Sequence, residues 1–220
     1  MGLRANALEL LLPYLPAKRV LSLGYPDLVM SPEVFQSMTG HYIRGRNPTG
    51  AGWHGKSEIP ETVDAFTALG TERFRAVDVS ASRGIEVIAD LNYPQDLGEW
   101  DLVIDPGTVE HCFNIGQALM NAAQAVAVGG IILHTPPLTM LNHGFYCLMP
   151  TLFHDFYGQN GWEILHLLLA GGKTTQLVPP TKRFQTAPEM SLYCLARRSS
   201  SAPLIYPTQS KYLANPSLSA

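Results

Sequence analysis

Short runs of β-branched and other apolar residues recur along the chain, separated by stretches in which apolar residues follow a helical spacing. Runs of about four to eight such residues, bounded by Gly, Pro or polar residues, are typical of strands. Seven segments fit this description, at residues 19–23, 74–79, 86–89, 101–104, 131–134, 162–169 and 190–196. The pattern therefore predicts a seven-stranded sheet.

The segments between these runs predict helices at residues 5–15, 32–38, 61–69, 113–128 and 151–157. Pro32 suits a first helical turn, and Gly129 with Gly130 suits the end of the alanine-rich fourth helix. Strands that alternate with helices form a mainly parallel sheet with helices on both faces. We therefore expect a three-layer α/β fold, with the first helix packed on an edge of the sheet.

Residues 40–60 interrupt this alternation with glycines interleaved among basic and aromatic residues. A loop of this length inside a compact domain is typical of a lid or a binding segment. Arg44 and Arg46 are candidates to clamp an anionic substrate, and Trp53 offers a stacking face. Ordinary solvated loop charges are the alternative.

Composition narrows the class of protein. Of the 220 residues, 46% are hydrophobic and 15% are charged, which suits strands covered on both faces. The formal charge of -3 leaves no basic surplus for a nucleic-acid backbone. The apolar runs fall far short of the roughly 20 residues that cross a bilayer, and the N-terminus lacks a signal-peptide pattern. We expect a cytoplasmic protein with one domain, residues 1–198, and an irregular tail, residues 199–220.

The spacing of cysteine and histidine gives no metal signature. The three cysteines are widely spaced, which favours buried reduced thiols over a disulfide framework or a CxxC site. The seven histidines include no HxH or HxxxH pair, and Cys112 beside His111 is too weak a signal. The sequence therefore predicts no metal site.

Four residues that follow predicted strands are candidates to touch one ligand. Gly24 follows the first strand, and Asp78, Asp90 and Asp105 end or follow the next three. In an open parallel sheet, ligands bind outside the carboxyl ends of the strands. A glycine there lets the backbone approach a ligand, and an acid can accept ribose hydroxyls or lie beside an adenine amino group. Each acid taken alone also fits a loop carboxylate or a helix cap.

A dinucleotide site is the obvious alternative, because it also uses a glycine turn and an acid on the ribose. The turn after the first strand reads Gly24-Tyr-Pro-Asp27 and not GxGxxG. One glycine followed by Pro26 does not provide the close approach to a pyrophosphate that the dinucleotide motif provides. A nicotinamide cofactor is therefore disfavoured.

Several motifs together resemble a poorly characterised branch of the class I (Rossmann-like) S-adenosylmethionine-dependent methyltransferases. The resemblance runs from about residue 19 to about residue 162, and the block around Glu110 and His111 is its most specific part. The motifs cover residues 21–27, 89–92, 101–114, 129–130 and 142–146. The resemblance implies a Rossmann-like sheet with an antiparallel last strand and S-adenosyl-L-methionine as cofactor.

The resemblance also implies a role for each matching position in cofactor binding. Gly24 would face the methionine part, Asp78 the ribose, and Asp90 with Leu91 the adenine. Asp105 and Gly107 would lie near the reacting methyl group, completing the set of predicted cofactor residues. Two features depart from the pattern: the first turn lacks GxGxG, and only about six residues separate the second strand from the third, fewer than the dozen or so of an ordinary parallel crossover.

Methyl transfer from a sulfonium needs an aligned nucleophile, removal of its proton and exclusion of water. Glu110, His111 and His143 are the candidates for a base or for orienting the substrate, because they follow the fourth and fifth strands. A histidine accepts a proton near neutral pH, with an ordinary pKa of about 6.5. His111 also fits a capping or packing role. Tyr146 belongs to an aromatic group that forms either core or a lid, and we predict that it contacts substrate.

These predictions favour an enzyme that transfers a methyl group to an oxygen or nitrogen of a small polar metabolite or sugar-like substrate. Two alternatives remain open. The chain could be an inactive methyltransferase-like binding or scaffold protein, or an enzyme that uses the same cofactor for another reaction, such as a cyclisation. We expect a small-molecule partner and neither nucleic acid nor membrane; a homodimer is compatible with the sequence.

Overall fold

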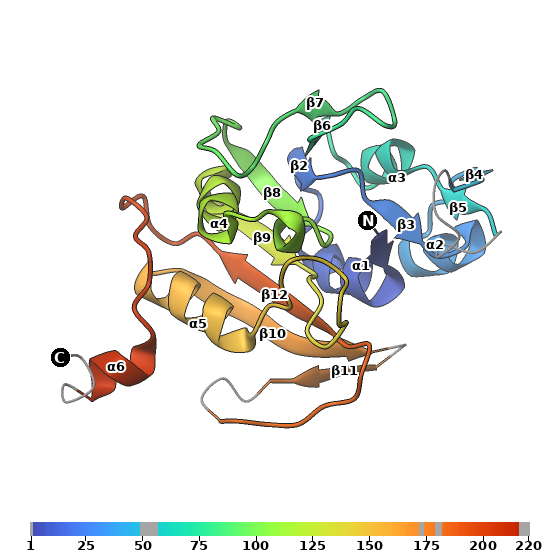
Figure 1. Cartoon of the computed structure of the whole chain (residues 1–220). Coiled ribbons are helices and arrows are strands. Elements are labelled where there is room, and N and C mark those ends of the chain that lie inside the picture. Colours follow the sequence, from blue (N-terminus) through green and yellow to red (C-terminus); the bar gives the residue numbers. More distant parts are fainter. Residues whose placement is uncertain (1, 49–56, 172–173, 179–181, 216–220) are drawn as a thin grey trace.

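The computed structural model describes residues 2–48, 57–171, 174–178 and 182–215. Within these residues a central sheet holds eight strands in the order β11-β10-β12-β9-β8-β2-β6-β7 (Figure 1). The strands are β2 (Arg19–Leu23), β6 (Arg73–Asp78), β7 (Val87–Ile88), β8 (Trp100–Asp105), β9 (Val126–His134), β10 (Glu163–Gly171), β11 (Thr174–Leu177) and β12 (Ser191–Arg197).

The direction of the strands follows the prediction, but their number does not. Strands β7, β6, β2, β8 and β9 are parallel, and β12 lies antiparallel between β9 and β10. The seven expected strands are present, with β12 as the antiparallel last one. The expected total of seven was wrong, because β11 adds an eighth strand antiparallel to β10. Its sequence, Thr-Thr-Gln-Leu, is too short and too polar to be recognised as a strand.

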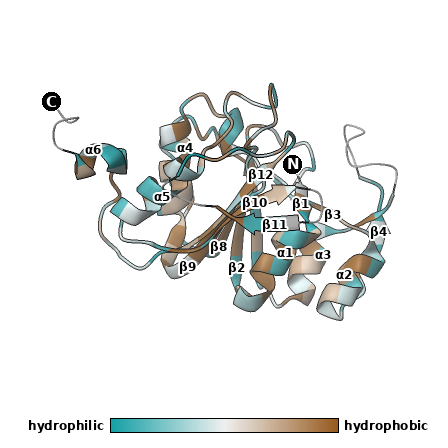
Figure 2. Cartoon of the chain, turned by 90° about the horizontal axis from the view of Figure 1, so that it is seen from below, coloured by the Kyte–Doolittle hydropathy of each residue, from teal (hydrophilic) through white to brown (hydrophobic). Residues whose placement is uncertain are grey.

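Helices cover both faces of the sheet, as expected (Figure 2). On one face lie α1 (Ala5–Leu11), α2 (Pro32–Thr39) and α3 (Thr62–Ala68). Leu8 and Leu11 of α1 are buried in one cluster with Val20 of β2 and Leu102 of β8. The first helix therefore packs on a face of the sheet and not on its edge, because its leucine stripe covers apolar residues of central strands. A short 3-10 helix, η1 (Leu12–Tyr14), follows it.

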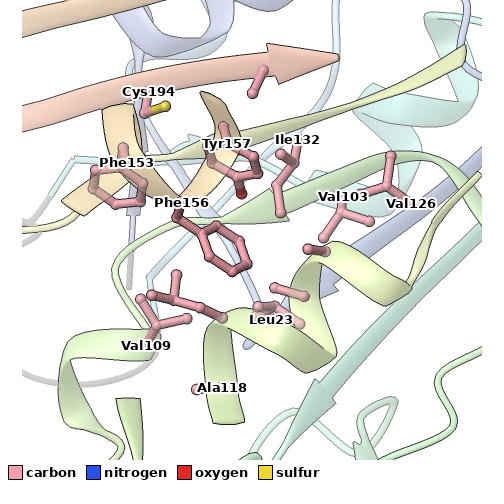
Figure 3. Close-up of a cluster of buried hydrophobic side chains, with 14 of the residues drawn as sticks. Leu23, Val103, Val109, Ala118, Val126, Ile132, Phe153, Phe156, Tyr157 and Cys194 are labelled. Atoms are coloured by element: carbon pink, nitrogen blue, oxygen red, sulfur yellow. The ribbon is translucent and has the colours of Figure 1, made fainter. Parts of the chain in front are cut away.

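The opposite face is covered by α4 (Ile115–Gln124) and α5 (Pro150–Gln159). Phe153, Phe156 and Tyr157 of α5 pack with Val103 of β8 and Ile132 of β9 in a second buried cluster (Figure 3). Pro150 begins α5 in the first helical turn, where its missing N–H has no helical partner to lose. The sheet is therefore buried on both faces, which accounts for the apolar strands of the sequence.

The boundary between α4 and β9 lies earlier than the pattern predicts. Residues 113–128 were expected to be one helix, but α4 ends at Gln124 and β9 begins at Val126. Val126 pairs with Trp100 of β8, a contact that a sequence pattern does not reveal. Gly130 lies inside this strand, where a Cβ would stand 2.9 Å from the carbonyl oxygens of Ala127 and Asp101. The two glycines therefore belong to the strand and do not end the helix.

The short connection between the second and third predicted strands is a turn without a helix. Residues 79–86 join β6 to β7, which pair in parallel through Val77 with Val87 and Asp78 with Ile88. The buried carboxylate of Glu86 accepts hydrogen bonds from the backbone N–H groups of Arg83 and Ile85, at 3.1 and 3.2 Å. A folded turn of this kind replaces the usual crossover helix.

Smaller elements complete the described chain. Strand β1 (Gly2–Arg4) pairs with β3 (Asp27–Val29), and β4 (Gly45–Arg46) pairs with β5 (Ile59–Pro60) at the base of the glycine-rich segment. The tail, predicted to be irregular, contains the short helix α6 (Ser210–Ala214). Ser210 donates its backbone N–H to Asp155 of α5 at 3.0 Å, which holds α6 against that helix. Within the described residues, the helices are too short or too polar to cross a membrane.

Candidate functional site

The carboxyl ends of the parallel strands meet at one edge of the sheet, and backbone hydrogen bonds tie these ends together. Gly24 donates its N–H to the carbonyl oxygen of Val77 at 2.6 Å, and Ala89 donates to that of Asp78 at 2.9 Å. Thr108, which follows β8, donates its hydroxyl to the carbonyl oxygen of Leu23. The structure therefore brings the segments that contain Gly24, Asp78, Asp90 and Glu110 to the same edge.

The first two predicted cofactor residues lie at the carboxyl ends of β2 and β6. Gly24 is buried and has a φ of 80°, a left-handed conformation that favours glycine. Asp78 is half-buried, and its Oδ1 accepts a long hydrogen bond from Ser80 N, at 3.3 Å. Gly24 and Asp78 therefore stand at the ends of two strands that pair directly with each other.

The third strand end is a loop packed against the start of α4. Oδ1 of Asp90 accepts hydrogen bonds from the backbone N–H and the side-chain Nδ2 of Asn92, at 2.9 and 2.8 Å. Asn92 in turn accepts from Asn114 N at 2.9 Å, and Asn121 donates to the carbonyl oxygen of Leu91 at 3.1 Å. Leu91 is buried. These contacts order the segment to which the sequence assigns the adenine.

Asp105, which the resemblance predicts to lie near the reacting methyl group, is part of a buried hydrogen-bond chain. It is fully buried, and its Oδ1 accepts the backbone N–H groups of Thr108 and Val109, at 2.8 and 3.3 Å. Its Oδ2 lies 2.7 Å from Nδ1 of His134, whose Nε2 lies 2.5 Å from the hydroxyl of Tyr157. Both carboxylate oxygens of Asp105 therefore have hydrogen-bond partners within the protein.

Sequence reasoning missed His134 and Tyr157 as members of this buried chain. Burial raises the pKa of Tyr157 well above its ordinary value, so its hydroxyl remains a donor to His134. The sequence did offer one indication, because His134 ends the fifth strand and Asp105 ends the fourth. In the structure the two residues are partners in the parallel pairing of β8 with β9. Which face of the strands they point to is not visible in the sequence.

Glu110 lies in a 3-10 helix, η3 (Val109–His111), just beyond β8. The neighbouring Val109 anchors η3 in the core cluster (Figure 3). The Glu110 side chain is fully buried, yet neither carboxylate oxygen has a hydrogen-bond partner among the described residues. Burial, together with the negative charge of Asp105, raises the pKa of Glu110 to about 8. Such an acid holds or releases a proton near neutral pH.

The two predicted catalytic histidines lie beside this carboxylate. Nε2 of His143 is 3.7 Å from Oε1 of Glu110, and Nε2 of His111 is 4.0 Å from the same atom. The centroids of the two imidazole rings are 5.2 Å apart. The side chain of His143 is 44% exposed and that of His111 is 47% exposed. Burial and the nearby His143 lower the pKa of His111, which favours its neutral form. The structure thus joins Glu110, His111 and His143, which the sequence assigned separately to catalysis.

The segment that carries His143 is fastened to η3 by its backbone. Phe145 and Tyr146 donate their N–H groups to the carbonyl oxygen of Glu110, at 3.0 and 3.3 Å. A Cβ on Gly144 would stand 3.0 Å from that oxygen and 3.0 Å from Nδ1 of His111. Tyr146, a predicted substrate contact, borders the cluster, but its hydroxyl donates to the carbonyl oxygen of Phe113 at 2.9 Å.

Of the predicted substrate residues in the glycine-rich segment, the structure describes Arg44 and Arg46. Arg46 pairs with Asp27 and with Glu61, each at 2.5 Å, so its guanidinium is occupied by acids of the protein. Arg44 is exposed. Trp53 lies outside the described residues. The charge that the sequence assigned to an anionic substrate is therefore, at Arg46, part of an internal ion cluster.

Cavities occur elsewhere in the described chain. One of about 970 Å³ lies between α5, the segment after β9 and α6, with Thr139, Met149 and His154 among its lining residues. It also borders the basic residues Lys182 and Lys211. It shares the segment after β9 with His143 but does not include Glu110, His111 or His143 in its lining.

The fold is that of the class I methyltransferases, with parallel strands in the order β7-β6-β2-β8-β9 and an antiparallel β12 beside them. A solved structure of this kind, TehB from Haemophilus influenzae, superposes with a TM-score of 0.53 over 89% of this chain at 12% identity. The chain spans 62% of the length of TehB. No protein-family model and no curated protein sequence matches the chain.

Two further solved structures have lower similarity. The trans-methyltransferase CalH in complex with SAH aligns over 88% of this chain and 57% of its own, with a TM-score of 0.49 and 14% identity. The 1,6-didemethyltoxoflavin-N1-methyltransferase from Burkholderia thailandensis, solved with its substrate and S-adenosylhomocysteine, aligns over 89% and 77%, with a TM-score of 0.48 and 17% identity.

Proposed function

We propose that the protein binds S-adenosyl-L-methionine at the carboxyl edge of β2, β6 and β7 and transfers its methyl group to a small polar acceptor. The observation that carries the proposal is the placement of Gly24, Asp78 and Asp90 on adjoining strand ends, next to the cluster of Glu110, His111 and His143. The acceptor atom is an oxygen or nitrogen of a metabolite or sugar-like compound.

The residues at this edge fit the cofactor. Gly24 is buried with a positive φ, so the backbone of the first turn can lie against the methionine part. The half-buried carboxylate of Asp78 is placed to accept ribose hydroxyls, and the ordered Asp90-Leu91 segment is placed to contact the adenine. When bound, S-adenosylmethionine supplies an electrophilic methyl group on its sulfonium.

The cluster beyond β8 provides the proton chemistry that an oxygen or nitrogen nucleophile requires. Glu110 has a pKa raised to about 8, and His111 has a lowered pKa. Groups with a pKa near the working pH are efficient general bases. The half-exposed histidines can contact an acceptor from solvent, while Glu110 behind them takes up or orients its proton.

Isothermal titration with S-adenosylmethionine tests the cofactor site. Asp78→Asn is expected to weaken binding at least about 10-fold, because a ribose loses its charged acceptor. Asp96→Asn is the control, since Asp96 is an exposed acid in the loop that leads into the amino end of β8, and its carboxylate accepts from Gly98 N. Wild-type protein that does not bind the cofactor, or equal affinities in both variants, contradicts the proposal.

A binding or scaffold protein is the second candidate, because the first turn has the single glycine Gly24 followed by Pro26. Mass analysis of products separates the candidates after the chain is incubated with S-adenosylmethionine and panels of hydroxyl and amine acceptors. Formation of S-adenosylhomocysteine with a methylated acceptor supports methyl transfer. Formation of methylthioadenosine supports a cyclisation, and cofactor binding with neither product supports the scaffold.

A further inference from the structure

We propose that Glu110, His111 and His143 form a binding site for a divalent transition-metal ion such as Zn²⁺. One carboxylate oxygen and one ring nitrogen of each histidine all lie within 4.8 Å of one another. The sequence predicts no metal site because its histidines lack the usual spacing. The fold brings the three residues together, because Glu110 and His111 follow β8 and His143 follows the adjacent strand β9.

The distances within the cluster are close to those of a metal centre. Zn²⁺ binds nitrogen and oxygen at about 2.0–2.2 Å in a tetrahedral arrangement, which places neighbouring ligand atoms roughly 3.4 Å apart. Nε2 of His143 and Nε2 of His111 lie 3.7 and 4.0 Å from Oε1 of Glu110. Small rotations of the half-exposed imidazoles are sufficient to bring three ligand atoms onto one ion.

The carboxylate of Glu110 provides an independent sign of a ligand. The residue is fully buried, and both oxygens lack a hydrogen-bond partner among the described residues. A buried polar group without a partner is unfavourable, and in native structures such a group calls for a water or ion that satisfies it. The neighbouring His111 and His143 supply imidazole nitrogens, which are common ligands of transition-metal ions.

The surroundings hold the three ligands in position before an ion binds. A Cβ on Gly107 would stand 2.9 Å from Oε1 of Glu110, so a larger residue at this position would have to displace the carboxylate. Gly144 allows the segment of His143 to approach His111 and the backbone of Glu110, and two backbone hydrogen bonds keep it there. The negative charge of Asp105 lies close enough to act on Glu110 and favours a cation at the same place.

Three protein ligands leave a coordination position open. The imidazoles of His111 and His143 are 47% and 44% exposed, so the open position faces solvent. Three-ligand zinc sites of this kind are typical of catalysis, where the ion binds an oxygen of water or substrate and lowers its pKa. In this chain the ion would bind the acceptor of the methyl group and lower the pKa of its proton, which replaces direct proton transfer to Glu110 or a histidine; this role rests on the proposed function.

Titration of EDTA-treated, dialysed full-length protein with ZnCl₂ tests the site. We expect one ion per chain with a Kd of about 10 μM or lower. Glu110→Gln and His143→Ala are each expected to weaken binding at least about 10-fold, because each removes one of three ligands. The control is His154→Ala, since His154 is also a half-exposed histidine beside a carboxylate, 3.1 Å from Asp155, and should bind as wild type.

Co²⁺ provides a second measurement that does not depend on activity. We expect Co²⁺ bound to the wild type or to His154→Ala to show the visible absorption bands of a four- or five-coordinate ion with nitrogen and oxygen ligands. We expect these bands to be absent in Glu110→Gln and His143→Ala. Circular dichroism checks that each variant is folded. Absence of Zn²⁺ binding by the wild type, or equal Zn²⁺ affinity in folded Glu110→Gln and His143→Ala, overturns the proposal.

Titration with S-adenosylmethionine in EDTA separates this proposal from the previous one. Cofactor binding without Zn²⁺ binding overturns the metal site and leaves the cofactor site standing. Zn²⁺ binding that is lost in Glu110→Gln, without cofactor binding, supports the metal site and contradicts the proposed function.

Discussion

At the scale of single residues, two buried acids near the end of β8 have opposite surroundings. Asp105 is satisfied by His134 and by two backbone N–H groups, so it acts as a fixed part of the core. Glu110 has comparable burial but no hydrogen-bond partner among the described residues. A buried acid that is satisfied is structural, and one that is not satisfied marks a site. This contrast is the reason that the proposals above involve Glu110 and not Asp105.

Gly107 is the residue whose substitution tests this environment most directly. Gly107→Ala is expected to lower the free energy of unfolding by about 2–4 kcal/mol, through a left-handed φ of 92° and contact of the new Cβ with the Glu110 carboxylate. Gly129→Ala has a similar φ of 86° but open space around its Cβ, so about 1 kcal/mol is expected. Urea denaturation measures both. Equal losses would show that the carboxylate does not lie against Gly107.

At the scale of elements, the start of β2 is joined to the start of β8 by an ion pair. Asp101 accepts hydrogen bonds from the backbone N–H of Arg19 at 2.9 Å and from its guanidinium at 2.6 Å. The hydrogen bond from the Arg19 side chain lowers the pKa of Asp101, and partial burial raises it by less. The net effect is a pKa below the ordinary value. A lowered pKa in the folded state stabilises the fold above the ordinary pKa, and this stabilisation is lost as pH falls through the lowered value.

Asp101→Asn should therefore cost stability near pH 7 and lose this effect in acid. We expect a decrease of about 1 kcal/mol or less at pH 7, because both side chains are partly exposed and solvent screens the pair. Below the lowered pKa of Asp101, the carboxyl is protonated in both the folded and the unfolded protein. The free energies of unfolding of the variant and the wild type should therefore converge as the pH falls toward that value. Urea denaturation at pH 7 and near pH 3 measures the difference. A gap that persists unchanged in acid excludes the charge as its cause.

The elements also show how far sequence reasoning reaches. Strands such as β2 and β8 were predicted within one residue or so, because buried parallel strands are continuous apolar runs. The helix over residues 113–128 was extended too far, because Val126 joins β9 through pairing with Trp100, a long-range contact. Strand β11 was missed for a different reason, since its four residues, Thr-Thr-Gln-Leu, are too few and too polar to form a recognisable strand pattern. Local pattern identifies elements, whereas pairing partners decide their ends.

For the candidate site, the sequence predicts which residues lie at the strand ends but not what surrounds their side chains. Gly24, Asp78 and Asp90 were chosen because carboxyl ends of parallel strands converge, and this rule depends on topology alone. Whether an acid is satisfied depends on side-chain direction, so the different surroundings of Asp105 and Glu110 were not visible. The same limit hid the approach of His143 to Glu110, since they are far apart in sequence and belong to different strand ends.

At the scale of the whole molecule, an ion cluster beside the sheet joins four segments that are distant in sequence. Asp27 is buried and pairs with Arg46 at 2.5 Å and Arg83 at 2.7 Å. Arg46 also pairs with Glu61 at the start of α3. The cluster thus connects the turn after Gly24, the glycine-rich segment, α3 and the β6–β7 turn. It therefore joins segments that lie beside the edge that we propose binds the cofactor.

Removing the central charge of this cluster should weaken both the fold and the cofactor site. Asp27→Asn leaves two guanidinium groups that are about four-fifths buried facing a neutral amide, and breaking such pairs costs about 2–4 kcal/mol. Because Asp27 directly follows the Gly24 turn, the affinity for S-adenosylmethionine should also fall. Glu72→Gln is the matched control: it removes an acid from the exposed pair with Lys18, and no measurable change is expected. Urea denaturation and isothermal titration measure the two effects. A loss of stability with unchanged cofactor affinity would separate the cluster from the cofactor edge.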